Sequence, residues 1–200
     1  MLLAPNEYRS QTKRDRRPLL FWSGVVLMTL LFCSLIIAAP LASAAGHTQV
    51  ALTIYQPFGL LCHQLPERSF FIAGHKFAVC ARCTGIYAGF ALTLLGYPLI
   101  RSLRSCSVPP RKWLFLGAVP LLIDFSLGFF GIWLNTHSSR FATGFLFGAV
   151  VVFYVMPAVA ELSQWRLSKR VRPALQTFTV PSPEAVASAS SDYSAPERRI

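Results

Sequence analysis

Residues 61–89, LCHQLPERSFFIAGHKFAVCARCTGIYAG, combine most of the chain's reactive side chains with the start of an apolar segment. They hold three of the five cysteines and two of the four histidines. Thiols and imidazoles are the side chains that bind soft metals or exchange disulfides. The stretch therefore predicts an ordered loop that carries chemistry and leads directly into a membrane helix.

The composition of the whole chain indicates a membrane protein. Hydrophobic residues make up 54% of the 200 residues, and the mean hydropathy is +0.48. Charged residues make up 14%, against roughly 25% in soluble domains. The net charge of +11 comes from short basic clusters beside apolar runs. We therefore expect contacts with anionic lipid head groups at the cytoplasmic face, and no binding of nucleic acid.

Four apolar segments predict an all-α integral membrane protein with four transmembrane helices. A helix rises 1.5 Å per residue, so about 20 residues cross a hydrocarbon core of about 30 Å. The expected spans are about 19–41, 80–100, 113–134 and 141–160. Residues 47–61 have a loose helical period and predict a short helix at the membrane surface.

The predicted organisation is one membrane domain between two tails. Residues 1–18 are basic, residues 19–165 form the four-helix domain, and residues 166–200 are basic and then rich in Pro, Ser and Ala, which predicts disorder. The first span followed by Ala42-Ser43-Ala44 also resembles a cleavable signal peptide. Its apolar run is longer than the usual 7–15 residues, which favours retention as a helix.

The basic residues predict the orientation. Fifteen Lys and Arg residues lie in the two tails and the 101–112 connection, against four in the other connections. The positive-inside rule then predicts a multi-pass protein of the cell membrane with both termini cytoplasmic. The cysteine-bearing loop lies on the outer face in this orientation.

Two GxxxG pairs predict a helix–helix contact. Gly85 and Gly89 belong to the second span, and Gly144 and Gly148 to the fourth. Small residues at this spacing let two helix backbones approach closely in lipid. We expect the second and fourth helices to touch there.

A longer pattern resembles a known family. The first block is Cys62-His63-Gln64, Pro66-Glu67-Arg68-Ser69-Phe70, Gly74 and Cys80-Ala81-Arg82-Cys83-Thr84-Gly85-Ile86-Tyr87. A second block is Asp124, Asn135, Arg140 and Thr143-Gly144. Together they resemble the signature of domain-of-unknown-function family 2085, a prokaryotic family of predicted membrane proteins, over roughly residues 55–148. The resemblance implies a polytopic membrane protein and no established activity.

The cysteines allow three chemistries. Cys80 and Cys83 form a CxxC pair, and Cys62 and His63 come from a distant turn, so the four could bind zinc or another thiophilic metal. Alternatively, Cys80 and Cys83 with Cys62 form a thiol–disulfide redox centre. A third possibility is a structural disulfide from Cys62 to Cys80 or Cys83. His75, an exposed-loop histidine beside a lysine, is a weaker candidate.

The arginines and one carboxylate predict a polar network. Arg68, Arg82 and Arg140 could converge on a phosphate, an anionic lipid head group or a carboxylate. Alternatively, each arginine snorkels or bonds to backbone carbonyls. Asp124 lies inside the third span, where an unpaired carboxylate is costly, so we expect a partner from another helix. The candidates are Arg82, Tyr87 and Arg140, and Asn135 joins the same predicted network. Asp124 and its partner would form either a structural hydrogen bond or part of a proton or cation relay. No catalytic residue, substrate or enzyme class follows from the sequence.

Overall fold

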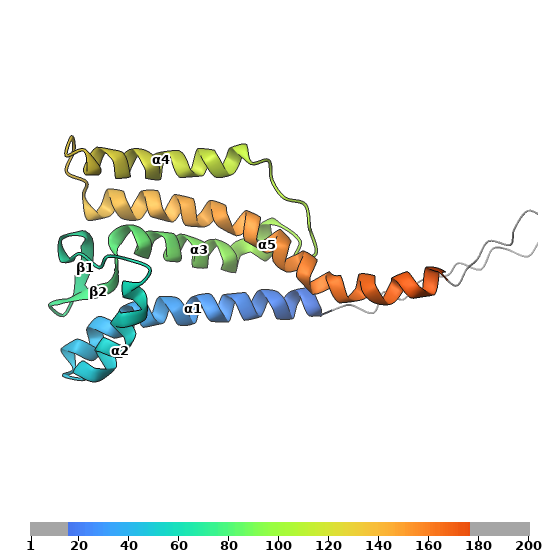
Figure 1. Cartoon of the computed structure of the whole chain (residues 1–200), viewed down its shortest axis with the longest axis horizontal. Helices are drawn as coiled ribbons and strands as arrows, with labels where there is room; N and C mark the ends of the chain where they lie inside the picture. Colours follow the sequence, from blue (N-terminus) through green and yellow to red (C-terminus); the bar gives the residue numbers. More distant parts are fainter. Residues whose placement is uncertain (1–15, 177–200) are drawn as a thin grey trace, which may run out of the picture. The chain divides into compact units, whose positions relative to one another are not determined.

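The computed structural model describes residues 16–176, and in this part four helices are long and apolar enough to cross a membrane. They lie side by side in Figure 1. Their bounds are α1, Arg17–Ala44, α3, Ala81–Ile100, α4, Lys112–Phe129, and the His137–Gln164 part of α5. The predicted fold class, an all-α integral membrane protein with four transmembrane helices, is confirmed. Large apolar side chains on the helices are exposed, as a lipid-facing surface requires.

The predicted contact between the GxxxG helices is present. A methyl group added at Gly85 would overlap the backbone carbonyl of Phe141, because α3 and α5 touch through their main chains. The contact is reciprocal, since glycines of both helices face a carbonyl of the other. The four pairs are Gly85 with Phe141, Gly89 with Phe145, Gly144 with Arg82 and Gly148 with Ile86. Close backbone approach of this kind maximises van der Waals contact where no hydrophobic effect acts.

The other two long helices join this pair through apolar packing and through polar or small residues, of which two contacts are examples. On α1, the indole Nε1 of Trp22 donates to the carbonyl of Leu94 on α3 at 3.0 Å. On α4, Gly117 faces the side chain of Val150 on α5. The first contact satisfies a polar group, and the second lets the two helices approach closely. Both kinds of contact hold helices together in lipid.

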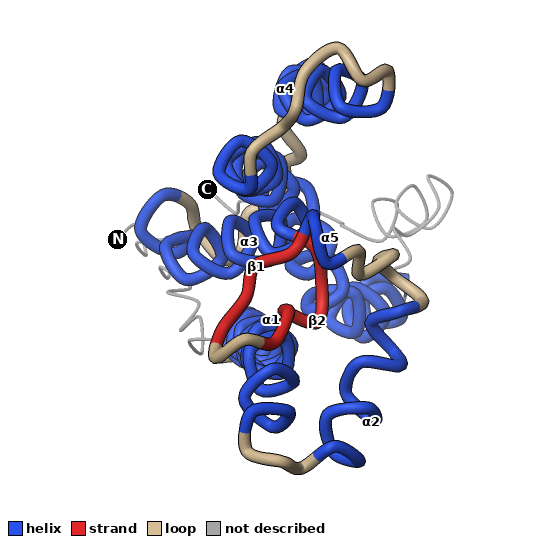
Figure 2. The backbone as a smooth tube through the Cα atoms, turned by 90° about the vertical axis from the view of Figure 1, so that its left-hand side faces the viewer, coloured by secondary structure: helices blue, strands red, loops and turns tan. Residues whose placement is uncertain are grey.

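One end of the bundle carries a small folded cap. It consists of α2, Thr48–Gly59, a 3₁₀ turn, η1, Pro66–Arg68, and an antiparallel hairpin of β1, Ser69–Ile72, and β2, His75–Cys80. Figure 2 shows the hairpin in front of the helix ends. The helix predicted at 47–61 is therefore present. The hairpin, in a stretch that we predicted only as an ordered loop, was not anticipated.

The hairpin turn has a backbone that non-glycine residues disfavour. Ala73 and Gly74 form the turn, with φ of 49° and 77°. Two successive residues with positive φ match the type I′ turn, whose twist suits a two-residue hairpin. Ala73 therefore occupies a left-handed conformation at some energetic cost.

A hydrophobic core fixes the cap to the helices. Its buried side chains come from α1, α2 and β2 and are Ile36, Ala39, Phe58, Ala78 and Val79. Cys62 and Cys83 pack against this core, as does Tyr87. The core therefore determines where the cysteines lie.

Two helix bounds differ from the prediction. α4 ends at Phe129, five residues before the predicted end at Leu134, because the chain turns at Gly131, whose φ is 69°. α5 runs from His137 to Gln176 and so continues past the predicted end of the fourth span at residue 160, through the basic segment and into residues 173–176, where the sequence predicted the start of a disordered tail. Arg, Leu and Lys favour helices, and no Gly or Pro lies between Pro157 and Pro173. Residues 1–15 and 177–200, which belong to the predicted tails, lie outside the described residues.

Candidate functional site

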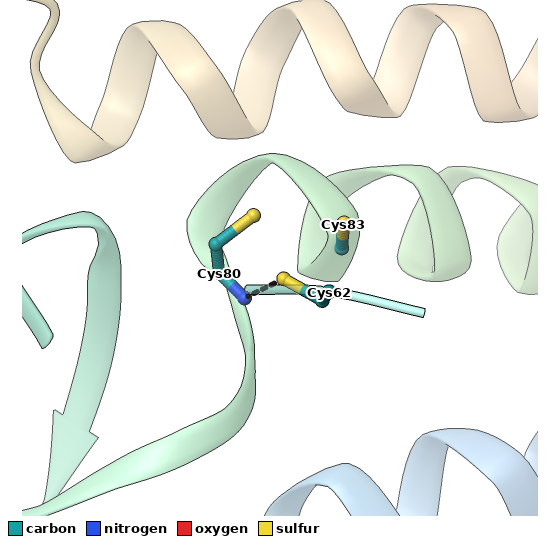
Figure 3. A group of neighbouring side chains, drawn as sticks. All are labelled: Cys62, Cys80 and Cys83. Carbon is teal, nitrogen blue, oxygen red and sulfur yellow. Dashed lines mark hydrogen bonds between the residues drawn. The ribbon is translucent and has the colours of Figure 1, made fainter. Parts of the chain in front are cut away.

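Three thiols meet where the cap joins α3. Cys62 follows α2, Cys80 is the last residue of β2, and Cys83 lies in the first turn of α3. Their sulfur atoms all lie within 4.8 Å of one another (Figure 3). All five cysteines are within the described residues, and none of them forms a disulfide bond with another. The structure thus brings together the three cysteines that the sequence singled out.

The loop before β1 is clamped so that Cys62 faces Cys80. The backbone N–H of Cys80 donates to Sγ of Cys62 at 3.2 Å (Figure 3). The side-chain amide of Gln64 donates to the carbonyl of Tyr55 at 2.8 Å, and Nζ of Lys76 donates to the carbonyl of Gln64 at 2.8 Å. These bonds tie the loop to α2 on one side and to β2 on the other. The clamp preorganises the thiol cluster.

The surroundings favour a thiolate at Cys62. Hydrogen bonds from the thiols of Cys80 and Cys83, and from backbone N–H groups, hold the pKa of the Cys62 thiol far below its ordinary value. Burial acts in the opposite direction and is outweighed. A thiolate is the form of cysteine that binds metals and attacks disulfides.

His63, the fourth predicted metal ligand, does not belong to this group. Its side chain is exposed, and the group within ligand distance contains only the three cysteines. His63 does line the pocket that the cluster faces. His75, in β2, is also exposed.

A pocket of about 610 Å³ connects the thiols with the predicted arginines. Its walls are the loop before β1, the start of α3, the end of α4, the α4–α5 turn and the start of α5. The lining residues that carry chemistry are Cys62, His63, Arg68, Cys80, Arg82, Cys83, Asn135 and Arg140. Residues up to 79 positions apart in the sequence therefore share one cavity with the three thiols.

Asp124 has the partner that the sequence required. Nη2 of Arg82 on α3 lies 2.5 Å from Oδ2 of Asp124 on α4, and Oγ of Ser139 donates to Oδ1 at 3.0 Å. The side-chain amide of Asn135 donates to the backbone carbonyl of Asp124. The expectation of a partner from another helix is confirmed, and of the three candidates it is Arg82.

Two members of the network differ from the sequence analysis. Tyr87, a predicted member, packs its ring on Phe32 of α1, with centroids 4.9 Å apart, and does not line the pocket. Ser139 was missed as a partner of Asp124. Its place one turn after Asn135 was the available signal, but nothing in the sequence gave the turn that brings α5 back against α4.

Fold and site together define a polytopic membrane protein that carries a three-thiol, arginine-lined pocket at one end of its helix bundle. Residues 62–154 match the model of the family described as "Predicted membrane protein (DUF2085)". The match begins at Cys62 and includes every pocket residue after Leu61.

Two proteins are similar to this chain in sequence. An "Uncharacterized protein" of Methanocaldococcus jannaschii is 37% identical over 143 residues, which is 69% of this chain and 92% of the relative. An "Uncharacterized protein" of Methanothermobacter thermautotrophicus is 37% identical over 87 residues, or 44% of this chain and 77% of the relative. No solved structure matches with significance. The chain belongs to the DUF2085 family of membrane proteins.

Proposed function

We propose that the protein binds a thiophilic metal ion, with zinc as the leading candidate, through Cys62, Cys80 and Cys83. The observation that carries this proposal is the convergence of three sulfur atoms within 4.8 Å of one another. Sulfur atoms on a tetrahedral zinc ion, with bonds of about 2.3 Å, lie about 3.8 Å apart. Small side-chain rotations bring these three thiols to that spacing.

The donor set suits an exchangeable or reactive metal better than a closed structural one. Three protein ligands leave the fourth tetrahedral position open, as in catalytic zinc sites. That position faces a pocket, and His63 on its rim is the side chain available to close it. The sequence pattern, Cys62-His63 with a later CxxC, also supports His63 as the fourth ligand.

The position at the start of α3 suits a negatively charged metal–thiolate cluster. The first-turn N–H groups of α3 receive no side-chain cap. Their partial positive charge favours the negative charge that three cysteine ligands bring to a bound metal ion.

The second candidate is thiol–disulfide exchange, and the lowered pKa of Cys62 favours it. The Cys62 thiolate would attack a disulfide of a partner protein and form a mixed disulfide. Cys80 or Cys83 would then attack Cys62, leaving an intramolecular disulfide here and a dithiol on the partner. The third candidate, a structural disulfide, requires Cys62 to be joined permanently to one of the other two cysteines.

The location belongs to the same proposal. The protein lies in the cell membrane with both termini cytoplasmic, and the pocket opens on the outer side. The bias of basic residues supports this orientation. The lipid bilayer is the one partner that the apolar helices require.

Two measurements on the full chain separate the candidates. Metal analysis of purified protein is expected to give about one ion per chain, lost on Cys80→Ser or Cys83→Ser and retained on Cys106→Ser. Thiol trapping before lysis then reports on the alternatives. Partial oxidation that varies with growth conditions indicates redox exchange, and complete oxidation indicates a structural disulfide. Either result without bound metal would reject the metal proposal.

A further inference from the structure

We propose that the same pocket binds a phosphate group, held by Arg68, Arg82 and Arg140 beside the thiol cluster. The ligand is a phosphate-bearing molecule, either a phospholipid head group or a water-soluble phosphate. This inference goes beyond metal binding and does not depend on it. It rests on charge, on unused donors and on the shape of the pocket.

The pocket lining carries an excess of positive charge. Three arginines line the pocket, and the lining residues, all within the described part of the chain, include no Asp or Glu. Asp124 lies behind the wall, where Oδ2 bonds Arg82 and Oδ1 bonds Ser139. It can offset one positive charge, and the Cys62 thiolate in the same lining can offset a second, which leaves about one positive charge. A phosphate group with a charge of about −1 would balance the pocket.

The three arginines of the pocket repel one another. Arg140 lies within electrostatic range of both Arg68 and Arg82. Like charges at the rim of a low-dielectric region repel one another, and each is costly to hold there unless it is paired. All three side chains line one cavity, Arg82 and Arg140 half-buried and Arg68 exposed. A bound anion converts this repulsion into attraction.

Arg82 has a buried hydrogen-bond donor that is unused among the described residues. Arg82 is held from two sides: Nη2 bonds Asp124, and the guanidinium lies over the ring of Phe125, 5.4 Å from its centroid. Nε of Arg82 is buried and has no hydrogen-bond partner among the described residues. Buried donors in folded proteins are nearly always satisfied, so such an atom indicates a missing ligand or ion. The orientation of Arg82 is set without the ligand, which makes it a preformed donor.

The donors of the pocket match a phosphate group in chemistry and geometry. Guanidinium groups bind phosphate oxygens through paired N–H bonds, and several together enclose a tetrahedral anion. The side-chain amide of Asn135 lines the same wall but already donates to the carbonyl of Asp124. It therefore shapes the site, and the guanidinium groups bind the anion. A volume of about 610 Å³ accommodates a head group and more than a single inorganic ion.

The experiment compares two probes on the full chain, purified in a non-ionic detergent without phosphate groups. One probe is inorganic phosphate, titrated by calorimetry. The other is phosphatidylglycerol, presented in mixed detergent micelles and followed by native mass spectrometry. Binding of inorganic phosphate identifies a soluble ligand. Binding of the lipid without binding of phosphate identifies a head group.

The variants are chosen to leave the fold intact. Arg68→Gln and Arg140→Gln remove donors with no hydrogen bond to another described side chain, whereas Arg82 is left in place because it pairs with Asp124. Each variant is expected to weaken binding of the active probe about tenfold or more. The control is Arg111→Gln, which removes an exposed arginine at the opposite end of α4 and should change binding less than about twofold.

Metal content and melting temperature are measured on the same samples. Retained metal with no binding of either probe overturns the phosphate site and leaves the metal proposal intact. Equal weakening by Arg111→Gln also overturns it, because the effect would then be general electrostatics. Binding that depends on Arg68 and Arg140 but persists in the Cys80→Ser variant, even without metal, supports a phosphate site that is independent of the metal.

Discussion

Arg82 on α3 and Asp124 on α4 form an ion pair with 2.5 Å between Nη2 and Oδ2, and their side chains are 19% and 9% exposed. The pair joins a helix that carries Cys83 to one that walls the far side of the pocket. It also pairs the carboxylate of Asp124, which would be energetically costly within a membrane helix if it were unpaired. The site and the bundle are therefore stabilised by the same contact.

Replacing only one residue of this ion pair should destabilise the protein strongly. Asp124→Ala leaves the Arg82 guanidinium without its partner, and we expect a loss of about 3–5 kcal/mol. The double variant Arg82→Met, Asp124→Leu removes both charges and should lose much less. Thermal unfolding in detergent measures both. Equal losses in the single and double variants would show that the pairing itself contributes nothing.

The glycine contact of α3 and α5 predicts a contrast within one helix. Gly85→Ala places a methyl group against the carbonyl of Phe141 and forces the two backbones apart, whereas a methyl group at Gly96 meets no atom within 4 Å. Gly85→Ala should lower the melting temperature markedly. Gly96→Ala should be neutral or should stabilise the helix by up to about 1 kcal/mol. Similar melting temperatures for the two variants would contradict the packing described.

The hairpin turn predicts a stabilising substitution. Ala73 has φ of 49°, which an L-residue with a Cβ adopts at a cost of about 1–2 kcal/mol. Ala73→Gly removes most of that cost, although a more flexible unfolded chain offsets part of it. We expect a net gain of about 0.5–1 kcal/mol, read from thermal unfolding. As a control, Gly74→Ala, at φ of 77°, should destabilise. A loss of stability in Ala73→Gly would be inconsistent with a left-handed residue at this position.

Thiol reactivity should depend on pH differently at Cys62 and in a free model thiol. Hydrogen bonds from Cys80 and Cys83 lower the pKa of Cys62, so its thiolate persists as pH falls below the ordinary thiol pKa. In metal-free protein, alkylation of Cys62 by iodoacetamide should vary little between pH 8 and pH 6, whereas alkylation of N-acetylcysteine in the same buffers should slow about tenfold per pH unit below about 8. Mass spectrometry measures both rates.

A matched variant tests the cause of that reactivity. Cys80→Ala with Cys83→Ala removes both thiol donors, so the pKa of Cys62 should rise and its alkylation should slow at pH 6. An unchanged profile would show that the neighbouring thiols do not stabilise the thiolate.

The sequence was sufficient for the helices because hydropathy and length act locally. Apolar runs long enough to span lipid define the four spans, and the GxxxG pairs identify which two helices touch. The end of α4 was placed too far along the chain because Ile132 to Leu134 are apolar. Hydropathy cannot register that Gly131 turns the backbone there.

The sequence predicted which residues contribute to the site better than it predicted their arrangement in space. The spacing of Cys62, Cys80 and Cys83 and the cost of a lone Asp124 each required partners, and the structure supplies them. The hairpin was not predicted because Ala73-Gly74 is a weaker turn signal than Asn-Gly. The contact of Tyr87 with Phe32 was not predicted because it depends on how α1 packs against α3. Such long-range contacts have no local pattern.

X-ray absorption at the zinc edge of the purified full chain tests the central claim most directly. The account predicts three sulfur neighbours at about 2.3 Å and one lighter nitrogen or oxygen neighbour. Replacing Cys80 or Cys83 with Ser should remove the metal or lower the sulfur count, while Cys106→Ser should leave the spectrum unchanged. A shell of nitrogen and oxygen alone, or zinc bound equally well after Cys62, Cys80 and Cys83 are all replaced, would contradict it.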